Sequence, residues 1–92
     1  MITSFRHKGL QRLFANSDQS GIPAYLRQRI ERMLDLLDAC EKPDEMAVLG
    51  YRFHALKGAR KGTYSVWVSG NWRMTFEFEN GHAINVNLED YH

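Results

Sequence analysis

The spacing of hydrophobic residues changes along the chain, from a helical period in the first half to a period of two in the second. Apolar residues three or four positions apart predict a short helix over 9–16 and a longer one from about Pro23 to Cys40. Proline fits the first turn of the second helix, where no backbone hydrogen bond is lost. The apolar stripe of that helix consists of Leu26, Ile30, Met33, Leu34 and Leu37.

The second half of the chain predicts a sheet. One helical turn is expected over 44–48, and after Gly50 apolar and polar residues alternate as in strands covered on one side. The length of 92 residues suffices for a single domain over 1–92. We expect an α+β fold, with two N-terminal helices packed on one face of a curved, mainly antiparallel sheet. Its strands are expected over 51–56, 64–69, 72–78 and 84–89, with 2–5 as a candidate edge strand.

The last turn decides which residues share a face of the sheet. Directly opposite residues of an antiparallel pair project from the same face. A two-residue turn at 80–81 would pair Phe76 with Asn85 and mix core and solvent positions. A three-residue loop over 79–81 pairs Phe76 with Ile84 instead, and is therefore the expected arrangement. The core face then holds Tyr64, Val66, Val68, Trp72, Met74, Phe76, Ile84, Val86 and Leu88.

The opposite face of the sheet is expected to be polar and basic. The net charge is only +1, but 52–76 holds five basic residues and no acid, whereas 31–45 holds six acids and two bases. This asymmetry is typical of a polyanion site, and equally of two solvated faces. An aromatic ring on such a face favours stacking on RNA bases. The face would carry Arg52, His54, Ser65, Trp67, Arg73, Thr75, Asn85 and Asn87, with Glu77 and Glu89 near its rim.

Composition narrows the class of protein further. Hydrophobic residues make up 43% and charged residues 25%, as in globular proteins. A single cysteine excludes an internal disulfide framework, and no run approaches the roughly 18 apolar residues of a membrane helix. We therefore expect a cytoplasmic protein without a membrane partner. Cys40 is expected in the core, and His82 at an exposed hairpin end. The four histidines lack paired-ligand spacing, so neither a metal nor another cofactor is expected.

Four segments carry a resemblance to a known family: 1–10 (MITSFRHKGL), 54–58 (HALKG), 70–76 (GNWRMTF) and 89–92 (EDYH). They resemble the RelE/ParE superfamily of bacterial toxins, specifically its HigB branch, over almost the whole chain. The resemblance implies the toxin of a type II toxin–antitoxin system that cleaves messenger RNA on the ribosome without a metal. It also implies a helix-turn-helix antitoxin of the HigA type. The toxin would contact operator DNA only through this antitoxin. The site positions that it implies are His54, Lys57, Arg73 and His92, with Asp90 and Tyr91 beside them.

The chemistry of such a cleavage fits these residue types. Attack by the RNA 2′-hydroxyl needs a base, charge stabilisation at the phosphate and an acid for the leaving oxygen. His54 and His92 are the natural proton carriers, and Lys57 and Arg73 suit the phosphate. Carboxylates near His92 favour its protonated form, which makes His92 the acid and His54 the base as a hypothesis. Further RNA contacts are expected from Arg52, Arg60, Lys61, Trp67 and Asn71.

Each of these residues also has a purely structural interpretation. His54 would be an inert surface histidine, Lys57 and Arg73 would keep the sheet soluble, and His92 would belong to a frayed terminus. Two other functions use the same fold or face. A ParE-type toxin inhibits gyrase by binding and needs no proton carriers, and an RNA-binding module uses the basic face without cutting.

Overall fold

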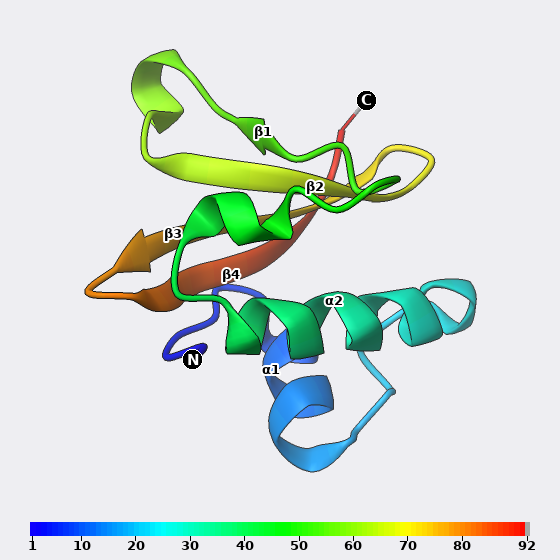
Figure 1. The fold of residues 1–92 in the computed structure, drawn as a ribbon. Helices are drawn as coiled ribbons and strands as arrows, with labels where there is room; N and C mark the ends of the chain where they lie inside the picture. Colours follow the sequence, from blue (N-terminus) through cyan, green and yellow to red (C-terminus); the bar gives the residue numbers. More distant parts are fainter. Residues whose placement is uncertain (92) are drawn as a thin grey trace.

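The computed structural model describes residues 1–91 and confirms the expected α+β architecture. Two helices, α1 (Lys8–Asn16) and α2 (Arg27–Ala39), lie on one side of a four-stranded antiparallel sheet (Figure 1). The strands follow chain order across the sheet, and short 3-10 helices connect the elements. The strands are β1 (His54–Ala55), β2 (Thr63–Ser69), β3 (Trp72–Glu79) and β4 (His82–Asp90); the 3-10 helices are η1 (Ala24–Leu26), η2 (Pro43–Met46) and η3 (Gly58–Arg60).

The two helices begin differently from each other. The imidazole of His7 caps α1, since its Nδ1 accepts a hydrogen bond from the Leu10 N–H at 3.1 Å. The second helix is preceded by η1, so Pro23 flanks a 3-10 turn and the α-helix begins only at Arg27. Among the described residues, no helix has the length and apolar character needed to cross a membrane.

One core joins the helices to the sheet. The stripe predicted for the second helix is fully buried, and Phe76 of β3 is the largest fully buried side chain. Cys40 is also buried, and burial raises the pKa of its thiol, which agrees with a packing role. The expectation for Ile84 was wrong, as the register below explains. The other buried members of the core include Leu10, Leu13, Ile22, Met46, Val66, Val68, Met74, Ala83, Val86 and Leu88.

The first strand is shorter than the pattern predicted. Only His54–Ala55 pairs regularly with β2, instead of the whole of 51–56. Arg52 has a φ of 51°, a left-handed conformation that interrupts the pleat. The Tyr51 carbonyl still accepts a hydrogen bond from the Trp67 N–H, at 2.6 Å. The segment before β1 therefore follows the sheet without belonging to its ladder.

The register of β3 and β4 corrects a second expectation. The turn has two residues, 80–81, so Glu79 faces His82 and Glu77 faces Ile84. A bulge then adds one residue to β4 opposite Phe76, and pairing resumes at Thr75 with Asn87. The three-residue loop was expected on the basis of regular pairing between β3 and β4 throughout. The bulge instead returns Val86 and Leu88 to the core face after the two-residue turn. As a consequence Ile84 shares the open face with Glu77, whereas the alternation had placed it in the core.

The opening segment 2–5 supports this bulge from the outer edge of β4. Parallel bridges join Ile2 to Ala83 and Phe5 to Val86, as expected for an edge segment. At the bulge, the Asn85 N–H donates to the Ser4 Oγ at 2.8 Å, and the Val86 N–H donates to the Ser4 carbonyl at 3.2 Å. The left-handed φ of Asn85, 53°, is one that asparagine tolerates better than most residues.

Candidate active site on the open face of the sheet

The face of the sheet turned away from the helices carries two rows of polar residues. Cross-strand pairing aligns His54 with Ser65, and Ser65 with Thr75 and Asn87. A second row runs through Trp67, Arg73 and Glu89. His54 is exposed at the sheet edge, but Ser65 and Thr75 are only 5% and 2% exposed. The centre of this face is therefore covered.

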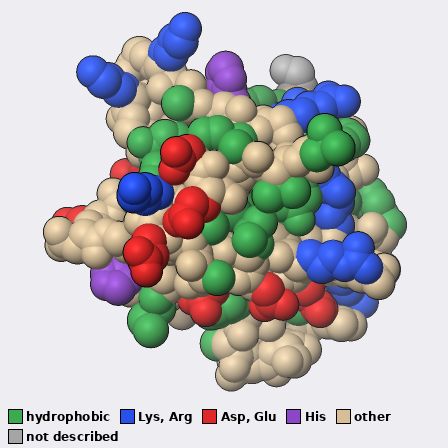
Figure 2. Space-filling view, viewed as in Figure 1, with side chains coloured by type: hydrophobic (Ala, Val, Ile, Leu, Met, Phe, Trp, Pro, Cys, Tyr) green, Lys and Arg blue, Asp and Glu red, His purple; other side chains and the backbone are tan. Residues whose placement is uncertain are grey.

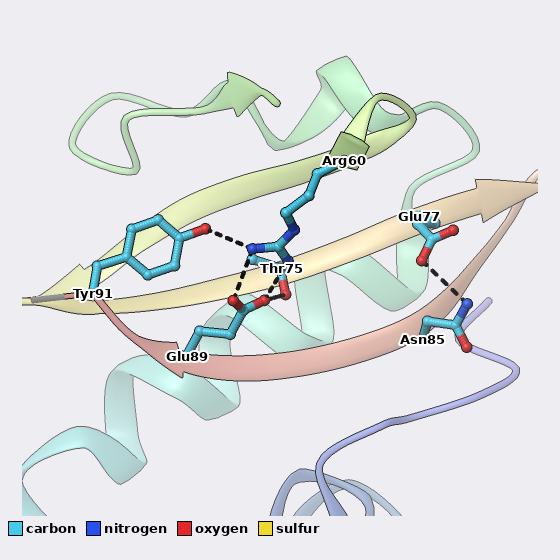
Figure 3. Close-up of polar contacts among 6 residues, drawn as sticks. All are labelled: Arg60, Thr75, Glu77, Asn85, Glu89 and Tyr91. Atoms are coloured by element: carbon cyan, nitrogen blue, oxygen red, sulfur yellow. Dashed lines mark hydrogen bonds and ion pairs between the residues drawn. The ribbon is translucent and has the colours of Figure 1, made fainter. Parts of the chain in front are cut away.

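An arginine from the loop between β1 and β2 lies over that centre. Arg60 reaches across to Glu89 on β4 (Figure 3), with Nη2 at 2.6 Å from Oε2 and Nη1 at 2.9 Å from Oε1. The Thr75 hydroxyl donates to the same Glu89 Oε2 at 2.5 Å. The hydrogen bonds from Arg60 are the main cause that lowers the pKa of Glu89, and the Thr75 bond adds to it. Glu89 lies on β4, the last strand in the sheet order, and its side chain is occupied by the Arg60 ion pair.

Tyr91 is held by backbone and side-chain contacts. Its N–H donates to the Asn71 carbonyl at 2.8 Å, which continues the ladder beyond β4. Its hydroxyl lies 3.3 Å from Arg60 Nη1, and the Arg73 guanidinium carbon lies 5.8 Å from its ring centroid. Tyr91 thus contacts one arginine through its hydroxyl and a second through its ring. Asp90 is exposed and pairs with Trp72 in the ladder.

The other expected catalytic residues are placed less closely together. Lys57 is exposed in the loop before η3, where it lines a hollow of about 660 Å³ with Lys61 and Tyr64. Arg73 is half-buried and donates to the carbonyl oxygens of Gly70 and Trp72, both at 3.3 Å. No hydrogen bond, ion pair or cation–π contact joins Lys57 to Arg73 or Tyr91 among the described residues. His92 lies outside the residues that the structure describes.

A polar groove of about 270 Å³ adjoins the Arg60–Glu89 pair. Arg6 was not among the residues expected at the site, and it lies here because the opening segment runs beside β4. The pairing of distant segments leaves no periodic signal, so sequence reasoning missed this residue. The groove is lined by Arg6, Ala59, Arg60, Lys61, Thr63, Thr75, Glu77 and Asn85.

Trp67, expected to stack on a base, already has two guanidinium partners. The guanidinium carbon of Arg52 lies 4.3 Å from the ring centroid, and that of Arg29 lies 5.4 Å from it. The indole N–H donates to the Gly70 carbonyl at 2.9 Å. Arg29 comes from α2 and was not among the residues expected at this face.

Charge is separated over the surface as the sequence predicted. Acidic side chains gather over α2 and η2, whereas Lys and Arg side chains project over η3 and on the opposite side of the view (Figure 2). The ion pair with Glu89 neutralises Arg60, so the open face is less positive than the number of its Lys and Arg residues suggests. The cations outside that pair include Arg6, Arg52, Lys57, Lys61 and Arg73.

The fold and this basic face are those of a RelE-like toxin of a type II toxin–antitoxin system. The chain belongs to the HigB-like family: a family model described as "RelE-like toxin of type II toxin-antitoxin system HigB" matches residues 3–92. "Endoribonuclease HigB" of Proteus vulgaris is 46% identical over 95 residues that cover 100% of both chains. "Toxin HigB-1" of Vibrio cholerae serotype O1 is 28% identical over 93 residues, 99% of this chain and 98% of the relative. The resemblance is confirmed, and membership gives the chain an antitoxin as partner.

Proposed function

We propose that this toxin is an endoribonuclease that cleaves messenger RNA on the ribosome. The observation that carries the proposal is the full-length identity of 46% to a protein named as an endoribonuclease. The open face adds support, because His54, Arg73 and Tyr91 all lie on or beside it. Phosphodiester cleavage needs a proton carrier and a cation, for which His54 and Arg73 are suited.

The proposed reaction is an internal transesterification of RNA. A base removes the proton of the 2′-hydroxyl, and the 2′-oxygen forms a bond to the adjacent phosphorus as the bond to the 5′-oxygen breaks. An acid delivers a proton to that leaving oxygen, which gives a 2′,3′-cyclic phosphate and a 5′-hydroxyl. We assign the base to His54, which is exposed at the sheet edge, and the acid to His92.

Cations stabilise the charge that develops on the phosphate. Arg73 is suited to two phosphate oxygens through its planar guanidinium, and Lys57 to one as a point charge. Both are accessible in the free toxin, Lys57 fully and Arg73 in part. Lys61 and Arg52 extend the cationic surface for the flanking RNA. Asp90, Tyr91 and Asn71 complete the proposed site beside the carboxyl end.

The proposal includes the partners of the toxin. Because the proposed site holds few acid and base groups, the toxin gains from a ribosome that holds the message in attack geometry. The antitoxin is proposed to be a helix-turn-helix protein of the HigA type that alone binds operator DNA. All of these partners place the toxin in the cytoplasm.

The test compares one RNA in two states. Purified toxin is added to a reconstituted translation reaction and to the same naked message, and the 5′ ends of the products are mapped. We expect strong cleavage of the translated message and weak cleavage of the naked one, and loss of cleavage in His54→Ala and His92→Ala. Equal rates on both RNAs would reject ribosome dependence. Inhibition of gyrase without cleavage would favour the ParE-type alternative.

A further inference from the structure

Arg60 is the cation of the open face whose charge is already neutralised. Both oxygens of Glu89 accept hydrogen bonds from it, although its side chain is 42% exposed. The carboxylate neutralises the charge of Arg60, which weakens its attraction for an RNA phosphate. Its remaining short contact runs to the Tyr91 hydroxyl, at 3.3 Å from Nη1. Arg60 is therefore placed to act on Tyr91.

The direction of that hydrogen bond follows from the chemistry of the groups. A guanidinium has donors and no acceptor, so the oxygen of Tyr91 must accept the bond. The phenolic proton of Tyr91 then has to point away from Arg60. The guanidinium carbon of Arg73 lies 5.8 Å from the centroid of the same ring, so a phosphate bound by Arg73 would lie beside Tyr91. The contact thus prepares Tyr91 to donate a hydrogen bond.

The same ion pair also affects Arg73. Arg73 lies directly opposite Glu89 in the ladder, a position from which opposite charges commonly pair. Arg60 takes both carboxylate oxygens, and the Thr75 hydroxyl donates to one of them. Among residues 1–91, no carboxylate lies within ion-pair distance of Arg73. Its charge is left available for a phosphate.

We propose that Arg60 and Glu89 are positioning residues of the cleavage site, with Arg60 aiming the Tyr91 hydroxyl at the RNA phosphate and Glu89 holding Arg60 in place. The proposal rests on the endoribonuclease function proposed above. It changes the role of Arg60 from a direct RNA contact to one that acts through Tyr91. Thr75, which is almost fully buried, anchors the network to the sheet.

A double-mutant cycle between Arg60 and Tyr91 tests the proposal. Arg60→Met keeps the length of the side chain and removes its donors, and Tyr91→Phe removes only the hydroxyl. We expect each to lower kcat for cleavage of translated message by about 10²-fold, the size of a positioning defect, with KM nearly unchanged. The double variant is expected to be no slower than Tyr91→Phe, because both changes remove one interaction. Losses that multiply would show that Arg60 acts independently, which would overturn the proposal.

Three further variants separate positioning from charge and from folding. Lys61→Met removes the neighbouring cation of the same loop, and is expected to raise KM with kcat retained. Glu89→Gln is expected to lower kcat as Arg60→Met does, and an unchanged kcat would refute the role of Glu89. Arg60→Lys keeps the charge and a donor group but loses the planar two-point contact, so part of kcat should return. Thermal unfolding of every variant identifies those that are folded at the assay temperature.

NMR of the free toxin tests the positioning role of Arg60 separately from the proposed endoribonuclease function, because it does not depend on RNA cleavage. In the free toxin, the NMR ring resonances of Tyr91 are expected to shift in Arg60→Met and Glu89→Gln but not in Lys61→Met. Unshifted resonances in Arg60→Met would overturn the positioning role even if the wild type cleaves. The expected shifts in a wild type that cleaves no translated message would support the Arg60–Tyr91 contact and refute only the proposed function.

Discussion

Replacing His7 with asparagine is expected to remove a pH dependence from the stability of the toxin. His7 caps α1 through Nδ1, which accepts the Leu10 N–H at 3.1 Å. An imidazolium has no acceptor, so protonation breaks this cap. Burial, and then the charge of Arg12, lower the pKa of His7. Asparagine is a good capping residue that does not titrate, which makes His7→Asn the matched variant.

The sign and size of the effect follow from proton linkage. Because the folded state resists protonation of His7, the unfolded chain binds more protons as the pH falls below the ordinary histidine pKa of about 6.5. Stability is therefore full above that value and is lost as the pH falls toward the lowered folded pKa. The lost cap is worth about 1 kcal/mol. In a domain of this size, that corresponds to a shift of about 4–8 °C in Tm.

The assay is thermal or urea unfolding of wild type and His7→Asn at pH 7.5 and at pH 5. We expect the two proteins to be within about 0.5 kcal/mol of each other at pH 7.5, and the wild type to lose about 1 kcal/mol more between the two pH values. The other titrating groups are common to both proteins and cancel in the difference. Parallel stability profiles for the two proteins would refute the neutral-histidine cap.

Substitutions at three positions test the packing and backbone of the fold. Gly9→Ala places a methyl 2.8 Å from the Gly21 carbonyl oxygen and should cost about 1–3 kcal/mol in urea unfolding. Phe76→Ala opens a cavity under the sheet and should cost about 3–5 kcal/mol, with a wild-type m-value if the loss lies in the native core. Asn85→Val puts a branched side chain at a φ of 53° and should destabilise by about 1–3 kcal/mol, whereas Asn85→Gly should be close to neutral; equal losses in the two would contradict a backbone cause.

Local patterns predicted the elements better than they predicted the contacts between them. The apolar spacing placed α1 within one residue of its observed start, and the alternation located β2 and β3. It overextended β1, because the left-handed backbone at Arg52 has no signature in hydrophobicity. The bulge in β4 was missed for a similar reason. It depends on hydrogen bonds that the Asn85 and Val86 N–H groups donate to Ser4, which lies far away in the sequence.

In the candidate site, too, the sequence predicted residue positions better than the contacts between side chains. The sequence identified most of the residue types on the open face, and the family resemblance was confirmed. It did not predict that Arg60 crosses two strands to reach Glu89, because loop direction is set by tertiary packing. It therefore counted Arg60 as a free cation. The roles assigned to His54, Lys57, Arg73 and His92 stay predictions for the cleavage assays.

The contact between the opening segment and β4 has a consequence for how the toxin is made. The hydrogen bond from Asn85 to Ser4 closes a loop of 81 positions, so the edge of the sheet forms only after nearly the whole chain has left the ribosome. Tyr91 and its partners emerge later still. During its own synthesis the protein lacks both the supported bulge and the assembled open face. Under the proposed function, a nascent toxin therefore lacks the assembled open face with which it would attack the message that encodes it.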